Sequence, residues 1–151
     1  MVLQFADGRP FALGACPYWD QLSPDPAETP RIVVAIWIGD SQTQAVVDTG
    51  GVYLVCDPEI PDLLDLDSSV RLGVATLVIR GHRYVGDLHK LTITLPAEEG
   101  ESLELEVTAF VPSLDPGQEW RFPSFLGLQG CLEFVRFAID PGANVFYFGR
   151  L

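Results

Sequence analysis

Two apolar, β-branched runs separated by a short turn constrain the fold of this chain most strongly. The runs are residues 32–38 and 43–47, and the turn between them is Gly-Asp-Ser-Gln at 39–42. β-Branched residues fit pleated strands, and Gly and Asp favour chain reversal. The segment therefore predicts a β-hairpin. Because both runs are almost wholly apolar, we expect both faces of the hairpin to be buried.

Strand signals recur through the rest of the chain, either as short apolar runs or as alternation of apolar and polar residues. They lie at residues 52–56, 74–79, 84–95, 103–111 and 145–148. The segment 103–111 alternates with the period of two that a half-buried strand requires. A basic tip at 80–83 separates two of the runs. Many short strands with turn chemistry between them predict a mainly β protein.

Two segments predict helical structure. Within residues 124–140, positions with helical spacing are Leu128, Leu132 and Val135 or Arg136. We expect one short helix there, between Gly127 and the final strands, although Gly130 weakens it by about 1 kcal/mol relative to Ala. Residues 57–69 predict a loop with at most one helical turn.

The first 30 residues differ in composition from the rest. They carry five prolines, at positions 10, 17, 24, 26 and 30. Such a stretch predicts an extended arm or loop, parts of which can pair as an edge strand, for example Phe5 or residues 11–13. A length of 151 residues favours one domain. We therefore divide the chain into a Pro-rich arm, residues 1–30, and one folded domain, residues 31–151.

The stretch AVVDTGGVYLV, residues 45–55, places one carboxylate inside an apolar strand. An ionised carboxylate costs several kcal/mol to bury unless its surroundings compensate it. Gly50 has no side chain, so backbone N–H groups can approach the Asp48 carboxylate and compensate its burial. The alternative is that Asp48 ends a strand and Gly50-Gly51 form an ordinary turn.

Two long segments resemble the retropepsin-like aspartic proteases. IVVAIWIGDSQTQAVVDTGG is similar to the opening hairpin and active-site loop of that family, and FPSFLGLQGCLEFVRFAIDPGANVFYFG is similar to its closing part. The resemblance covers residues 31–149 in the family's order. It implies a mainly β fold, a retropepsin-like closed β barrel with one short helix near the C-terminus, and it implies that residues 31–151 are the protease domain.

The resemblance also implies the chemistry of peptide-bond hydrolysis. Such an endopeptidase uses two carboxylates that share one proton around an attacking water. The catalytic residues would be Asp48, Thr49 and Gly50, with the Thr49 hydroxyl bonding backbone in a partner loop. The chain contains no second Asp-Thr-Gly or Asp-Ser-Gly. The expected enzyme is therefore a C₂ homodimer with one Asp48 from each chain. The strand at 145–148 is either part of the dimer interface or an ordinary core strand.

By the same resemblance, two further segments would bind the peptide substrate. One is a flap tip made by Arg80, Gly81 and His82, and the other consists of Gly51 with Phe125-Leu126-Gly127. The basic tip departs from the glycine-rich, apolar tips of viral members, and it favours acidic residues in a substrate. For Arg83 the alternative is a solvated, charged hairpin. Gly51 also departs from the family, which commonly has Ala, Ser or Thr there.

Charge and motifs exclude several other functions. A net charge of −12 disfavours nucleic acid and anionic membranes as partners. His82 and His89 are the only histidines, and no metal-binding spacing is present. GxSxG, GxxxxGK[ST] and GxGxxG are also absent, so we expect no metal and no cofactor.

The three cysteines, at positions 16, 56 and 131, are far apart and form no CxxC. This pattern favours a reducing compartment. The chain starts without a signal-peptide pattern and contains no apolar run long enough to span a bilayer. We therefore expect a cytoplasmic protein.

A non-enzyme remains the alternative function. The same β barrel can serve as a dimeric binding or dimerisation module without catalysis, because a fold does not fix a function. The atypical tip and Gly51 favour this alternative.

Overall fold

The computed structural model describes residues 2–21, 31–64, 66 and 70–151. Strands dominate these residues, and the protein is mainly β. The strands are β1 (Leu3–Gln4), β2 (Pro10–Ala12), β3 (Gly14–Pro17), β4 (Trp19–Gln21), β5 (Arg31–Ile38), β6 (Ser41–Val52), β7 (Leu54–Val55), β8 (Gly73–Ile79), β9 (His82–Leu95), β10 (Glu99–Gly100), β11 (Leu103–Ser113), β12 (Ser124–Gln129), β13 (Val135–Asp140) and β14 (Val145–Arg150). A short helix, α1 (Pro61–Leu64), and one 3₁₀ turn, η2 (Leu132–Phe134), complete the described elements.

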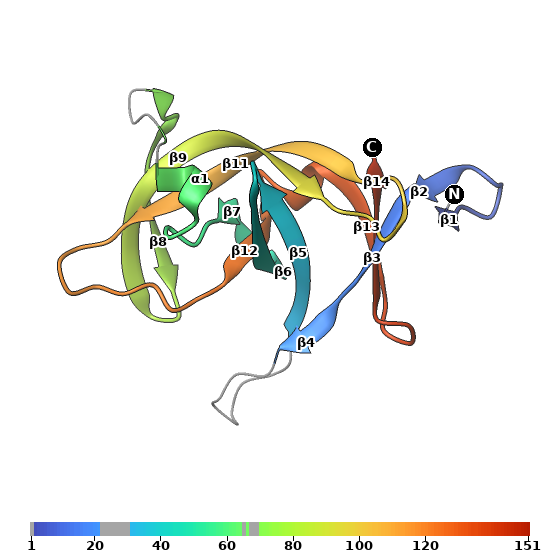
Figure 1. Ribbon diagram of the computed structural model, residues 1–151, viewed down its shortest axis with the longest axis horizontal. Helices are drawn as coiled ribbons and strands as arrows, with labels where there is room; N and C mark the ends of the chain where they lie inside the picture. The colour runs from blue at the N-terminus through green and yellow to red at the C-terminus, as the bar shows by residue number, and fades with distance from the viewer. Residues whose placement is uncertain (1, 22–30, 65, 67–69) are drawn as a thin grey trace.

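An eight-stranded sheet forms the body of the molecule (Figure 1). Its strand order is β4-β5-β6-β12-β7-β11-β9-β8. β5 also pairs with β9, through Trp37 opposite Thr94 and Ile38 opposite Ile93. Strand pairing consequently runs in a ring through β5, β6, β12, β7, β11 and β9. The predicted hairpin at 32–47 is confirmed as β5 and β6, and the predicted strands at 52–56, 74–79, 84–95 and 103–111 are confirmed as β7, β8, β9 and β11.

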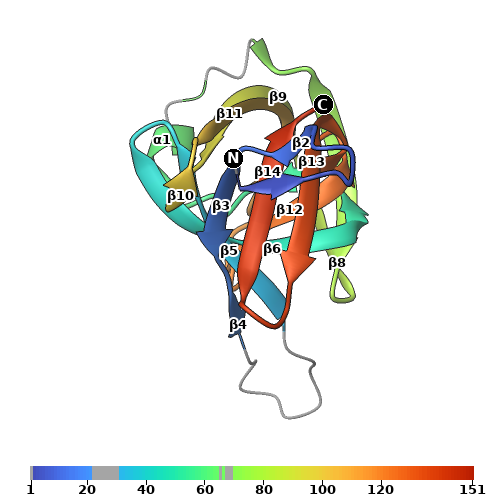
Figure 2. The same cartoon turned by 90° about the vertical axis from the view of Figure 1, so that its right-hand side faces the viewer.

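A second, four-stranded sheet has the order β10-β3-β14-β13 (Figure 2). β14 lies between β3 and β13, and Phe146 and Phe148 on it are fully buried. The predicted strand at 145–148 is therefore present as a core strand. Parts of the Pro-rich arm are extended as predicted, because β3 pairs with β14 and β4 pairs with β5. The proposed boundary at residue 30 falls outside the described residues.

The expected helix near the C-terminus is wrong. Leu128 belongs to β12, and Val135 and Arg136 belong to β13, so only the three residues of η2 turn helically. Gly130 has φ +79°, a left-handed conformation that breaks an α-helix. The helical turn expected within 57–69 is present as α1.

The body has a second hydrophobic cluster besides its main core. Its buried members include Val46, Val55, Phe110 and Phe125. Phe110 shares the alternate face of the strand at 103–111 with Glu104, Glu106 and Thr108, yet it is fully buried. The reason is that β11 is covered on both faces, by the main core on one and by this cluster on the other.

Candidate active site

The Asp48 loop, residues 48–53, consists of the end of β6 and Tyr53, and it begins where β6 leaves the core. Ala45 and Val46 are buried, Val47 is half-buried, and Asp48 is exposed. The backbone N–H of Gly50 donates a 3.2 Å hydrogen bond to Asp48 Oδ1. The predicted approach of backbone N–H groups to this carboxylate is therefore confirmed. The predicted burial of Asp48 is not seen in the single chain, because the strand has passed the edge of the cluster that covers Val46.

β12 holds this loop from the other side. It runs parallel to β6, with Phe125 opposite Val46 and Gly127 opposite Asp48. The N–H of Gly127 donates to the carbonyl of Tyr53 at 2.8 Å, and the N–H of Tyr53 donates to the carbonyl of Gln129 at 2.7 Å. Tyr53 has φ +62°, a conformation that these two bonds help to hold. Two strands and a pair of backbone bonds thus fix the position of the loop.

Glycine is required at position 127 by the closeness of the loop. A Cβ there would lie 2.5 Å from the carbonyl oxygen of Tyr53 and 2.6 Å from the carbonyl carbon of Val52. Backbone atoms cannot move aside as a flexible side chain can. Gly51 is also close to the carboxylate, since a Cβ there would lie 2.9 Å from Asp48 Oδ2. The Asp48 carboxylate therefore occupies space that a side chain at position 51 would take.

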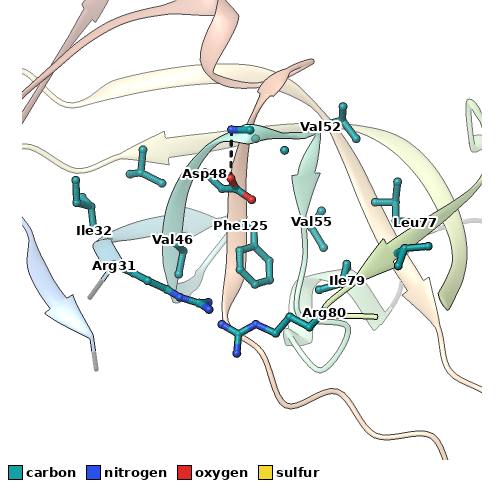
Figure 3. Close-up of a pocket in the computed structure, with 15 residues that line it drawn as sticks. Arg31, Ile32, Val46, Asp48, Val52, Val55, Leu77, Ile79, Arg80 and Phe125 are labelled. Atoms are coloured by element: carbon teal, nitrogen blue, oxygen red, sulfur yellow. Dashed lines mark hydrogen bonds between the residues drawn. The ribbon is translucent and has the colours of Figure 1, made fainter. Parts of the chain in front are cut away.

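A cleft of about 710 Å³ opens in front of the loop (Figure 3). Asp48 lies on one side of it, and the end of β8 lies on the other. The residues that line it are Arg31, Ile32, Val46, Val47, Asp48, Gly50, Gly51, Val52, Val55, Leu77, Val78, Ile79, Arg80, Phe125 and Gly127. The second hydrophobic cluster supplies its apolar wall through Val46, Val55 and Phe125.

The structure brings most of the predicted site residues together at this cleft. Those that line it are Asp48, Gly50, Gly51, Arg80, Phe125 and Gly127. The other four do not line it. Thr49 is exposed beside Asp48, Gly81 and His82 lie at the exposed hairpin tip, and Leu126 is buried in the main core.

Sequence reasoning missed the lining residues contributed by strand pairing. Arg31 is the main example, because it begins β5 and the sequence marks it only as the start of the folded domain. Val33 pairs with Val46 in antiparallel register, so continuing that register by two residues brings Arg31 level with Asp48. The hairpin register was the available signal. Leu77 and Ile79 come from β8, and only the tertiary fold places them opposite the loop.

The charges in the cleft are few and asymmetric. Among the described residues that line the cleft, Asp48 is the only acidic one, and Arg31 and Arg80 are the only cationic ones. Both guanidinium groups lie at the same end of the cleft, facing one another below Phe125 in Figure 3. The described lining thus combines one carboxylate, an apolar wall and two arginines at one end.

The cysteines are unsuited to nucleophilic chemistry. Burial raises the pKa of Cys16 to about 11 and that of Cys131 to about 12, and burial raises the pKa of Cys56 further still. A thiol that keeps its proton is a poor nucleophile.

In the part of the chain that the structure describes, no group of three or more His, Cys, Asp or Glu side chains lies close enough to hold a metal ion. Across those same residues, no helix is both long and apolar enough to cross a membrane. The sequence matches no protein-family model, and no curated protein matches it.

Proposed function

We propose that this protein is an aspartic endopeptidase of the retropepsin-like type that acts as a C₂ homodimer. The observation that carries the proposal is the placement of Asp48. Its carboxylate stands exposed in a cleft, on an Asp-Thr-Gly loop that β12 holds in place. The ring of strand pairings supports the closed barrel that the sequence resemblance implies.

One chain supplies half of the required site. Proton-sharing catalysis needs two carboxylates, and among the described residues that line the cleft Asp48 is the only acidic one. The surface around Asp48 is open to a second copy, because Thr49 and Gly50 are exposed and the nearby Leu128 exposes 41% of its surface. An exposed leucine beside an exposed carboxylate suits a two-fold contact that buries both. In that contact Thr49 would bond to the partner's loop.

The chemistry then follows from two Asp48 carboxyl groups in different protonation states. The ionised carboxylate takes a proton from a water, and the water oxygen attacks the carbonyl carbon of the scissile bond. The protonated carboxyl of the other chain donates to the carbonyl oxygen as negative charge develops there. Collapse of the tetrahedral intermediate breaks the C–N bond: the carboxyl that received the water proton gives it to the leaving amine, and the other carboxylate takes back the hydroxyl proton.

The hairpin formed by β8 and β9 acts as the cover of this site. The inner side of β8 lines the cleft through Leu77 and Ile79, opposite the Asp48 loop. A hairpin in this position encloses an extended peptide and excludes water from the reacting bond. Arg80 is the part of its tip that reaches the cleft.

Cleavage of a diverse peptide pool from about pH 3 to about pH 8 tests the proposal, since that window spans ordinary and raised carboxylate pKa values. The matched variant is Asp48→Asn, because an amide oxygen can still accept the hydrogen bond from Gly50. We expect cuts from the wild type only, with a loss of at least about 1,000-fold in the variant. Equal cleavage by both proteins would contradict the proposal.

Two observations favour the second candidate, a dimeric binding module. The tip of the β8–β9 hairpin is basic and exposed. The Asp48 carboxylate also lies where a side chain at position 51 would have to go, and glycine at that position leaves the space open. Two folded dimers with empty cleavage profiles would select this function. A protein that stays monomeric at working concentration would count against both candidates.

A further inference from the structure

We propose that the segment between β11 and β12, residues 114–123, is a latch that holds the β8–β9 hairpin over the cleft, with Trp120 and Phe122 as its positioning residues. None of its residues is among the described residues that line the cleft, so the segment would act on the site through the hairpin. This deepens the proposed function and rests on it, because it names how access to the same site is controlled.

The segment runs alongside the hairpin. In Figure 1 it is drawn in orange, and it passes beside β8 and β9 on its way from β11 to β12. Gln118 Nε2 donates a long, 3.4 Å hydrogen bond to the carbonyl oxygen of Arg83, the second residue of β9. Gln118 Oε1 accepts a 3.1 Å bond from the backbone N–H of Asp115, which orients the amide. The segment is thus attached to the hairpin just past its tip.

Three aromatic rings strengthen this attachment, Tyr84 from β9 and Trp120 and Phe122 from the segment. The ring centre of Tyr84 lies 5.1 Å from that of Trp120 and 6.4 Å from that of Phe122, and Trp120 lies 5.2 Å from Phe122. All three pairs meet edge to face, an arrangement that is attractive beyond the burial of the rings. Tyr84 and Trp120 are both buried by these contacts and their surroundings. The start of β9 is therefore packed against the segment.

Phe122 also connects the tip of the hairpin to the wall of the cleft. The guanidinium carbon of Arg80 lies 5.4 Å from the centre of the Phe122 ring, and a cation over an aromatic face is attracted to it. The Phe122 ring lies 6.3 Å, centre to centre, from Phe125, which lines the cleft from β12. A change at Phe122 should therefore be felt by the hairpin, although Phe122 does not itself line the cleft.

The indole N–H of Trp120 opposes these contacts. Among the described residues, Trp120 Nε1 is the one buried side-chain nitrogen or oxygen without a hydrogen-bond partner. A buried donor that makes no bond costs free energy, because water would bond the same group. Separation of the segment from the hairpin would expose the indole to water and remove that cost. The rings favour the closed hairpin and the indole N–H favours the open one, so the two states lie closer in free energy than the ring contacts alone would set them.

Limited proteolysis tests the latch without any peptide substrate. Trypsin cuts after Arg80 and Arg83 at the tip, and the hairpin must open locally before it fits the trypsin site. Cuts after Arg136 are the internal reference, because Arg136 lies in β13 of the other sheet. All proteins carry Asp48→Asn, which prevents self-cleavage, and Arg121→Gln, which removes an exposed cutting site within the segment. Mass spectrometry gives the initial rate of each cut.

Phe122→Ala should speed the tip cuts about tenfold and leave the Arg136 cut nearly unchanged, because it removes the ring contacts with Tyr84 and Trp120. Phe122→Tyr keeps the ring and should stay within about twofold of the parent protein. Gln118→Ala removes the long hydrogen bond and leaves the rings in place, so it should speed the tip cuts about twofold.

Phe137→Ala is the matched control. Phe137 is a half-buried ring like Phe122, and it stacks on Phe146 at 6.0 Å in the four-stranded sheet. Its replacement should speed the Arg136 cut and leave the tip cuts at the parent rate. Equal acceleration of tip and Arg136 cuts by Phe122→Ala, or no acceleration of the tip cuts, would overturn the inference.

Peptide kinetics separate this inference from the proposed function. With Asp48 intact, Phe122→Ala should raise KM several-fold and lower kcat less, since a hairpin that opens more often holds a peptide less well. A wild type that cleaves no peptide contradicts the proposed function alone, and faster tip cuts in Phe122→Ala would still support the latch. Peptide cleavage by the wild type with unchanged tip cuts in Phe122→Ala overturns the latch and leaves the proposed function standing.

Discussion

The Asp48 loop and the tip of the β8–β9 hairpin face each other across one cleft, and they are built in opposite ways. Residues 48–52 of the loop are the end of β6, which lies between β5 and β12, and the backbone bonds of Tyr53 tie the loop to β12 at Gly127 and Gln129. Among the described strands, β8 pairs only with β9 and lies at the end of its sheet, and Val78 on it exposes 68% of its surface. Nothing lies within 4 Å of a Cβ built on Gly81.

In the proposed endopeptidase, this difference would make the Asp48 loop a fixed floor of the site and the hairpin tip an open cover. Catalytic groups need positions fixed to within a fraction of an ångström, and the floor is the part of the site held by strand pairing on both sides. Admission and release of a peptide need a segment that makes few contacts, as the hairpin tip does. Substitutions in the two regions should therefore have different consequences.

The largest effect is expected from crowding the floor with Gly127→Ala. The added Cβ would meet Tyr53 O at 2.5 Å, and backbone atoms surround it. We expect the free energy of unfolding to fall by about 3 kcal/mol and cleavage to be lost with it. Urea denaturation measures the first effect, and peptide cleavage measures the second.

Gly73→Ala is the matched control for that substitution. Gly73 begins β8, has no left-handed φ, and has nothing within 4 Å of a built Cβ. Its replacement should change stability by less than about 0.5 kcal/mol. Equal losses of unfolding free energy in Gly127→Ala and Gly73→Ala would contradict the distinction between the fixed Asp48 loop and the open hairpin.

High pH should lower the free energy of unfolding through two buried thiols that follow β7 and β12. Cys56 follows β7 and Cys131 follows β12, and burial raises the pKa of both, that of Cys131 to about 12. Above the unfolded pKa, near 8.5, the unfolded chain loses these protons while the folded chain keeps them. The contribution of these thiols to the free energy of unfolding is therefore complete below about pH 8.5. Above that pH the free energy of unfolding falls by about 1.4 kcal/mol per thiol and pH unit. Urea titrations at successive pH values check the slope, and Cys131→Ala should reduce it.

A smaller effect is expected from stiffening the cover with Gly81→Ala. Gly81 has φ +80°, so an alanine there costs about 1 kcal/mol even though the space is open. We expect that loss of stability together with a change in kcat/KM, since the tip conformation is altered. Gly8→Ala shares the positive φ and the open space, at a turn of the β1–β2 hairpin. It should cost the same stability and leave cleavage unchanged.

The sequence predicted the strands best where apolar residues recur over several positions, as in β5, β6, β9 and β11. It failed at 124–140, because helical spacing of a few leucines competes with a strand pattern and only tertiary pairing decides between them. The Asp48 loop could be predicted from Asp-Thr-Gly and its surroundings. Arg31 could not be assigned from composition, since its position depends on the register of the hairpin.

The central claim is that one chain holds half of the site, and mixing chains tests it most directly. Wild type is refolded with an excess of Asp48→Asn, so that subunits pair at random. At a ratio of one to nine, about one dimer in a hundred carries two Asp48 carboxylates. The account predicts that cleavage per wild-type chain falls about tenfold on such mixing. Cleavage per wild-type chain that stays constant at every ratio would contradict it, because each chain would then act alone.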